Sequence, residues 1–177
     1  MCIRDSENFD WSDISPTIFG AVFESTLNPE TRRSGGMHYT SIENIHKVID
    51  PLFLNDLRAE LAEIQQIPVV RTRRSRLEAF QEKLAGLTFL DPACGSGNFL
   101  TERYLSLRRM ENEIVRSLID AREGRTKDQR DQITAGQIMW GITDSTVLEP
   151  IKVSIQQFYG IEINDFAATV AKTALWI

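Results

Sequence analysis

LTFLDPACGSGNFL, the stretch from Leu87 to Leu100, decides the fold of this chain. An apolar strand runs into a tight turn that contains Gly95 and Gly97, and the pattern then continues directly as a helix. Glycine lets the backbone adopt positive φ and lets a ligand approach the main chain closely. The stretch therefore predicts the opening βα unit of a parallel α/β sheet, with a nucleotide-type cofactor at the turn.

The turn does not match the two common phosphate-binding loops. A dinucleotide-binding fingerprint has a third small residue at the position that Leu100 occupies in this chain. A P-loop ends in Gly-Lys-Ser or Gly-Lys-Thr, but here Gly97 is followed by Asn98 and Phe99. We therefore expect the turn to hold an uncharged or cationic part of a ligand, beside the carboxylate of Asp91.

A second apolar run, Phe158 to Ile161, ends on Glu162. A carboxylate at the tip of a neighbouring strand is where a ribose would be held. The segment before Glu162 is much longer than the roughly twenty residues of a dinucleotide unit. A solvent-exposed acid at a strand end stays open as the alternative, but the turn and the acid together favour an adenosine cofactor.

Apolar residues at helical spacing predict helices on both sides of the turn. One helix starts at Ser15-Pro16, and the next is expected to start at Thr40, with a capping box between Thr40 and Glu43. A last helix is capped by Asn164 or Asp165. The expected buried stripes are Ile42, Ile45, Val48 and Ile49; Leu54, Leu57, Leu61 and Ile64; Leu77, Phe80 and Leu84; Leu100, Tyr104, Leu107, Met110, Ile114 and Leu118; and Ala167, Val170, Ala171, Ala174 and Leu175.

Composition places the chain among soluble globular proteins, with 177 residues, 42% hydrophobic and 25% charged. No apolar run approaches the roughly 20 residues of a membrane span, and Cys2 and Cys94 do not suggest a disulfide, so we expect a cytoplasmic protein. The net charge of −5 argues against a main DNA-binding face. The basic run Arg71 to Arg76 is either a solvated helix start or a phosphate contact.

Three motifs resemble those of S-adenosylmethionine-dependent DNA methyltransferases that modify the N6 amine of adenine. Asp91 to Leu100 resembles motif I, Gly160 to Asp165 resembles motif II, and Gly36 to Ser41 resembles motif X. The order X, I, II fits the adenine enzymes in which motif X comes first. The resemblance is closest to MmeI-like restriction-modification enzymes and covers the chain from about Ile18 to Ile177.

The resemblance implies S-adenosylmethionine as cofactor and double-stranded DNA as partner, contacted mostly through regions outside this chain. It implies a helical segment with motif X over residues 1–86, then an incomplete Rossmann-like class I methyltransferase fold over residues 87–177. Glu162 would hold the ribose, and Tyr39 with Thr40 would close over the methionine end. The implied cofactor-binding residues are Tyr39, Thr40, Asp91, Pro92, Ala93, Cys94, Gly95, Ser96, Gly97, Asn98, Phe99, Glu162 and Ile163.

The catalytic Asn-Pro-Pro-Phe motif of that family does not occur in the sequence. We therefore assign no catalytic residue and expect a fragment that is inactive alone. A methyltransferase of RNA or protein, or a non-catalytic cofactor-binding module, stays open as an alternative. His38 and His46 are too isolated to indicate a metal site and are interpreted as ordinary residues.

Overall fold

The computed structural model describes Val22, Ser25 and residues 40–123 and 151–176. The helix predicted to start at Ser15-Pro16 lies, apart from Val22 and Ser25, outside these residues. Tyr39 and the rest of motif X before Thr40 also lie outside them. The site is therefore built from the remaining predicted residues.

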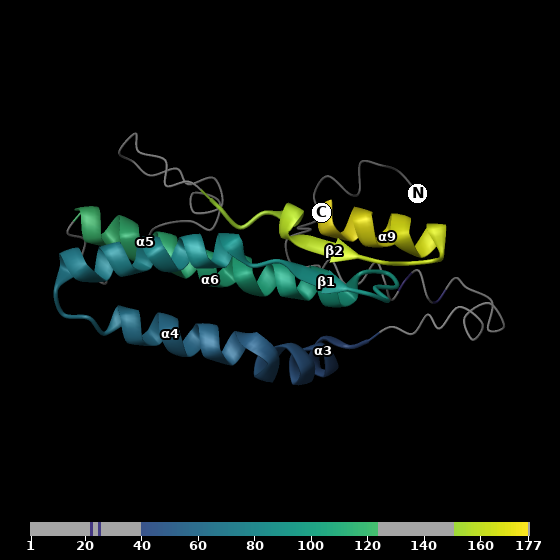
Figure 1. Cartoon of the computed structure of the whole chain (residues 1–177), viewed down its shortest axis with the longest axis horizontal. Helices are drawn as coiled ribbons and strands as arrows, with labels where there is room; N and C mark the ends of the chain where they lie inside the picture. The colour runs from purple at the N-terminus through teal and green to yellow at the C-terminus, as the bar shows by residue number, and fades with distance from the viewer. Residues whose placement is uncertain (1–21, 23–24, 26–39, 124–150, 177) are drawn as a thin grey trace, which may run out of the picture.

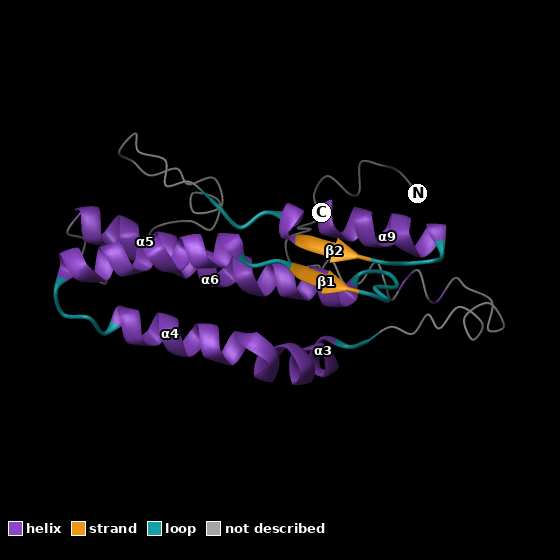
Figure 2. Ribbon diagram, in the orientation of Figure 1, coloured by secondary structure: helices purple, strands orange, loops and turns teal. Residues whose placement is uncertain are grey.

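The described chain is mostly helical, with a small parallel sheet at one end of the helices (Figures 1 and 2). Helices α4 and α5 pack against each other, and α5 packs along α6. The order is α3 (Ile42–Ile49), a π-helical turn (Asp50–Leu54), α4 (Asn55–Gln65), α5 (Val70–Gly86), β1 (Phe89–Asp91), α6 (Asn98–Glu123), a 3-10 turn (Ile155–Gln157), β2 (Phe158–Gly160) and α9 (Asp165–Trp176).

Strands β1 and β2 pair in parallel, with Phe89 opposite Phe158 and Asp91 opposite Gly160. The rings of Phe89 and Phe158 stack with centroids 5.2 Å apart, and the ring of Tyr104 from α6 meets Phe158 edge-on at 5.6 Å. Two parallel strands with a helix between them in the sequence form the predicted βα arrangement. The strand starts at Phe89, two residues later than expected, because α5 continues to Gly86 and Leu87 still caps that helix.

The stripes predicted for the helices before β2 form one core with Val153 and Phe158, and Leu175 of the last predicted stripe packs against it. Val48 is an exception, being 48% exposed, because α3 buries only Ile45 and Ile49 and Val48 lies at the margin of that narrow stripe. The buried members of the predicted stripes are Ile45, Ile49, Leu54, Leu57, Leu61, Ile64, Leu77, Phe80, Leu84, Leu100, Leu107, Met110, Ile114, Leu118, Ala167, Ala171 and Ala174.

The predicted capping box at the start of α3 is wrong by one residue. The N-cap is Ser41 rather than Thr40, and its side chain makes no capping hydrogen bond. Glu43 therefore stands at the second helical position, whereas the reciprocal box needs it at the third. The start of α9 is as predicted, since Asn164 Oδ1 accepts from the backbone N–H of Phe166 at 3.1 Å and of Ala167 at 3.0 Å.

Two buried polar side chains fix the path into β2. Glu111 of α6 accepts hydrogen bonds from the backbone N–H of Lys152 at 2.6 Å and of Val153 at 3.1 Å. Gln157 donates from Nε2 to the carbonyl oxygens of Leu84 at 2.8 Å and Leu87 at 2.7 Å. The start of β2 is thus tied both to α6 and to the segment that leads into β1.

Candidate cofactor site

The candidate site lies where β1 and β2 end side by side. The N–H of Ile161 donates to the carbonyl of Asp91 at 2.9 Å, and the N–H of Cys94 donates to the carbonyl of Ile161 at 3.1 Å. Asp91 also accepts at Oδ1 from the N–H of Ala93 at 3.1 Å. Backbone hydrogen bonds therefore join the turn after β1 to the segment after β2.

The two glycines of the turn have positive φ but different surroundings. Gly95 has φ +53°, and a Cβ built on it would meet nothing within 4 Å. Gly97 has φ +82°, and its Cβ would lie 2.8 Å from Cβ of Ala171 in α9. Gly97 is therefore required by the close approach of α9, whereas Gly95 faces open space in which a ligand has room.

Glu162 connects the turn to the start of α9. Its Oε2 accepts from the N–H of Gly95 at 2.9 Å, and its Oε1 accepts from the N–H of Asn164 at 2.8 Å. Each oxygen of an ionised carboxylate can accept a second hydrogen bond. The half-buried carboxylate can therefore hold the turn and still accept from two ligand hydroxyls.

Cys94 packs inside the turn. A Cβ on Gly160 would lie 2.6 Å from its Sγ, so the thiol occupies the space beside the end of β2. Burial, and then the negative charges of Asp91 and Glu162, raise the pKa of the Cys94 thiol. The thiol is neutral at pH 7 and does not act as a thiolate nucleophile.

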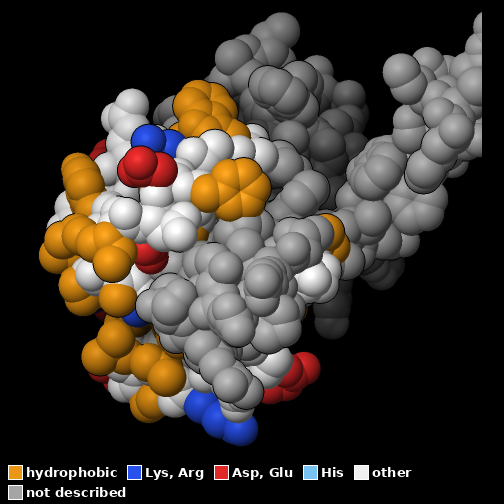
Figure 3. Space-filling view, turned by 90° about the vertical axis from the view of Figure 1, so that its right-hand side faces the viewer, with side chains coloured by type: hydrophobic (Ala, Val, Ile, Leu, Met, Phe, Trp, Pro, Cys, Tyr) orange, Lys and Arg blue, Asp and Glu red, His pale blue; other side chains and the backbone are white. Residues whose placement is uncertain are grey.

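The structure brings together most of the residues that the sequence predicted for the site. The turn and Glu162 are in hydrogen-bond contact, and Ile163 follows with 95% exposure. Figure 3 faces this end of the molecule and shows several hydrophobic side chains at its surface. Thr40 is half-buried just before α3, and α3 packs against α6. The roles of these residues as cofactor ligands remain predictions.

Sequence reasoning missed two buried carboxylates on α6. Glu111 is fully buried and accepts from Gln81 Nε2 at 2.9 Å and from Arg108 in addition to the backbone of the segment before β2. Glu102 is 1% exposed, and its Oε1 lies 3.1 Å from Nε2 of His46. The four-residue spacing of His46 and Asp50 could have indicated that pair, but no local pattern indicates the contact with Glu102.

Two of the four arginines in the basic run at the start of α5 make contacts within the chain. Arg73 donates from Nη1 to the carbonyl of Ile67 at 3.0 Å, and Nε of Arg74 pairs with Glu78 at 2.9 Å. Arg71 and Arg76 are exposed. Arg71 and Arg76 are thus the two arginines to which both interpretations of the run, a solvated helix start and a phosphate contact, still apply.

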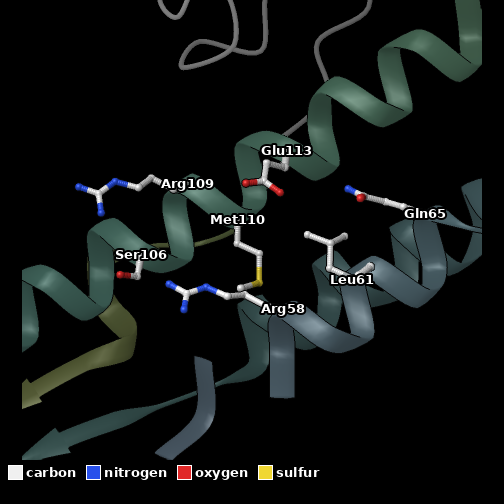
Figure 4. Close-up of a pocket in the computed structure, with 8 residues that line it drawn as sticks. Arg58, Leu61, Gln65, Ser106, Arg109, Met110 and Glu113 are labelled. Carbon is white, nitrogen blue, oxygen red and sulfur yellow. The ribbon is translucent and has the colours of Figure 1, made fainter. Parts of the chain in front are cut away.

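A cavity of 280 Å³ lies between α4 and α6, away from the glycine turn (Figure 4). Arg58 and Arg109 line it beside Leu61 and Met110. Both arginines are paired with carboxylates, Arg58 with Asp50 at 3.3 Å and Arg109 with Glu102 at 3.1 Å. The cavity therefore lacks the uncompensated positive charge of an anion site.

Residues 40–123 and 151–176 hold neither a cluster of metal-binding side chains nor a membrane-spanning helix. No group of three or more His, Cys, Asp or Glu side chains in these ranges is placed to hold a metal ion. None of the helices described there is both long and apolar enough to cross a membrane.

Residues 67–177 match the family model described as the DNA-methyltransferase domain of MmeI. DNA methyltransferase A of Bacillus subtilis is 37% identical over 177 residues, which is 100% of this chain and 17% of that protein. A putative type II restriction enzyme and methyltransferase of Methanocaldococcus jannaschii is 24% identical, over 99% of this chain and 15% of that protein. The solved structure of the type IIL restriction-modification enzyme MmeI in complex with DNA is 40% identical, with a TM-score of 0.70, over 95% of this chain and 19% of that one.

Proposed function

Because the chain belongs to the family of the MmeI DNA-methyltransferase domain, we propose that it is the S-adenosylmethionine-binding part of a DNA methyltransferase acting on the N6 amine of adenine. One observation carries the proposal. The carboxylate of Glu162 and the N–H of Gly95 meet at 2.9 Å at the ends of two parallel strands, beside open space. Parallel α/β proteins bind their ligands at this edge of the sheet.

We further propose that β1 and β2 are two strands of a Rossmann-like class I methyltransferase sheet. Their parallel pairing around α6 supports this. Residues 1–86 would be the helical segment with motif X and residues 87–177 the cofactor-binding domain. Buried residues from both parts, such as Ile45 and Phe158, belong to one core, so the two parts pack as a unit.

The described residues fit the cofactor. Glu162 has lone pairs left to accept from the ribose hydroxyls, Gly95 leaves room for the ligand, and exposed Ile161 and Ile163 offer an apolar surface to a base. Asp91 and Thr40 would border the methionine part. When bound, S-adenosylmethionine supplies the methyl group. The residues of this chain bind and orient the cofactor. Correct alignment of the reacting groups raises the rate of the reaction.

Replacing Glu162 by alanine in the full-length protein is expected to weaken S-adenosylmethionine binding by about 1.5 to 3 kcal/mol, or roughly 10- to 100-fold in Kd, for lost hydrogen bonds to a charged group. Isothermal titration calorimetry measures this. E162Q keeps one acceptor oxygen, so its loss should be smaller. The control is D165N, which removes a charge three residues away that is exposed in the first turn of α9.

The outcomes of this experiment separate two questions. An E162A protein that binds the cofactor as tightly as the unaltered protein removes Glu162 from the site. No binding by the unaltered protein overturns the proposed function.

The acceptor is tested by incubating the full-length protein with S-adenosylmethionine and DNA and digesting the DNA to nucleosides. N6-methyl-2′-deoxyadenosine is the expected product, and methyl transfer only to added RNA or protein contradicts a DNA acceptor.

A further inference from the structure

One histidine joins the helix that follows Thr40 to the helix that follows the glycine turn. His46 lies in the second turn of α3, and its Nε2 is 3.1 Å from Oε1 of Glu102 in the second turn of α6. Its Nδ1 is 2.8 Å from Oδ1 of Asp50. The His46 side chain is 23% exposed and that of Glu102 is 1% exposed. The contact is therefore largely interior and links α3 to α6.

The geometry favours the protonated ring. Both ring nitrogens of His46 face carboxylate oxygens, which only accept hydrogen bonds when ionised, and a neutral imidazole has a single N–H to donate. The imidazolium donates to both. The hydrogen bond to Asp50 raises the pKa of His46, partial burial opposes it, and the bond to Glu102 raises it further.

Glu102 has few hydrogen-bond partners other than His46. Its Oε2 is buried and makes no hydrogen bond within the described part of the chain, and its Oε1 is shared between His46 and Arg109. Arg109 is 65% exposed. Without the proton on His46, a buried carboxylate is left with one solvent-screened cation, which is costly. The other charged group in the network is Arg58 of α4, which pairs with Asp50 at 3.3 Å.

We propose that His46 is a positioning residue for the cofactor site: its protonated form holds α3, and with it Thr40, against the start of α6 and the glycine turn. The inference rests on the proposed function, in which Thr40 and the turn lie on two sides of S-adenosylmethionine. Cofactor affinity then falls as the imidazolium loses its proton, because α3, which directly follows Thr40 and Ser41, loses this contact to α6.

The stabilising effect of the contacts among His46, Asp50 and Glu102 is lost both at high pH and at low pH, through different groups. Because the folded-state pKa of His46 is raised, its contribution to stability is full below the ordinary value of about 6.5 and is lost as pH rises through the raised pKa. The pKa of Asp50 is lowered, first by the bond from His46, so its contribution is present above its ordinary value and is lost as pH falls through the lowered pKa. The alkaline limit belongs to His46.

The test measures the Kd of S-adenosylmethionine by calorimetry on the full-length protein from about pH 6 to about pH 9, a range that spans an ordinary histidine pKa of about 6.5. At about pH 6, H46Q should bind S-adenosylmethionine about fivefold more weakly than the unaltered protein, a factor at the lower end of those known for coupling between two sites. The difference in Kd between the two proteins should become smaller as pH rises. Comparison at each pH cancels the titration of the ligand itself. K47Q is the matched control, since Lys47 is exposed on the same helix and bonds to Asn44.

E102Q provides an independent arm should H46Q fail to fold. The amide nitrogen can take the place of Oε1 and donate to the unprotonated Nε2 of His46, while Arg109, which is 65% exposed, can turn to solvent. The alkaline decline in affinity should therefore disappear. An H46Q protein with the affinity and pH profile of the unaltered protein overturns the inference alone. So does an equal loss at every pH, which indicates a merely structural role. Absence of cofactor binding by the unaltered protein overturns the proposed function as well.

Discussion

Replacing Glu111 by alanine is expected to lower the free energy of unfolding by about 3 to 5 kcal/mol, the usual cost of removing one partner from a buried ion pair. Glu111 is fully buried and compensates Arg108, and it also receives the backbone N–H groups of Lys152 and Val153. Alanine leaves these donors unpaired in the interior. Denaturation with urea, followed by circular dichroism, measures the loss.

The matched control is E113A, which removes a carboxylate from an exposed position on the same helix. Its effect should stay within about 0.5 kcal/mol, as for most surface substitutions. Hydrogen exchange gives a second readout, because E111A should remove protection from the amides of Lys152 and Val153. A loss below about 1 kcal/mol, the net value of one ordinary hydrogen bond, would contradict the role assigned to Glu111.

The second large effect is expected at Gly97, where alanine should cost about 2 to 5 kcal/mol of stability. Its φ of +82° disfavours a side chain by about 1 to 2 kcal/mol, and overpacking against Ala171 adds about 1 to 3 kcal/mol. Gly95 is the matched comparison, since its φ is +53° and its added Cβ meets nothing. G95A should therefore show the conformational cost alone.

Cofactor binding should rank the two glycine variants in the opposite order. The methyl group of G95A enters the open space beside Glu162, so the folded variant should bind S-adenosylmethionine more weakly. G97A should retain more affinity at temperatures where it remains folded. Melting curves and calorimetry on both variants give the comparison. Equal stability losses for the two would show that α9 does not require the missing side chain of Gly97.

Local patterns predicted the helices and the glycine turn between the first strand and its helix, because periodicity and turn chemistry act over a few residues. The stripe from Leu54 to Ile64 is an example. The start of α3 was misplaced because Thr40 and Ser41 are both good caps. The buried roles of Glu102 and Glu111 could not be predicted, since their partners His46 and Lys152 are 56 and 41 residues away in sequence.

The bonds of Gln157 have a consequence for the order of folding. They join residues that are 70 or more positions apart, whereas α4 and α5 are neighbours along the chain. Closing a long loop costs entropy before its contacts form, so the helical hairpin should assemble early and β2 should dock late. A substitution at Gln157 should then mainly accelerate unfolding and leave the refolding rate nearly unchanged. The half-life of the folded site would be set at its last-formed strand.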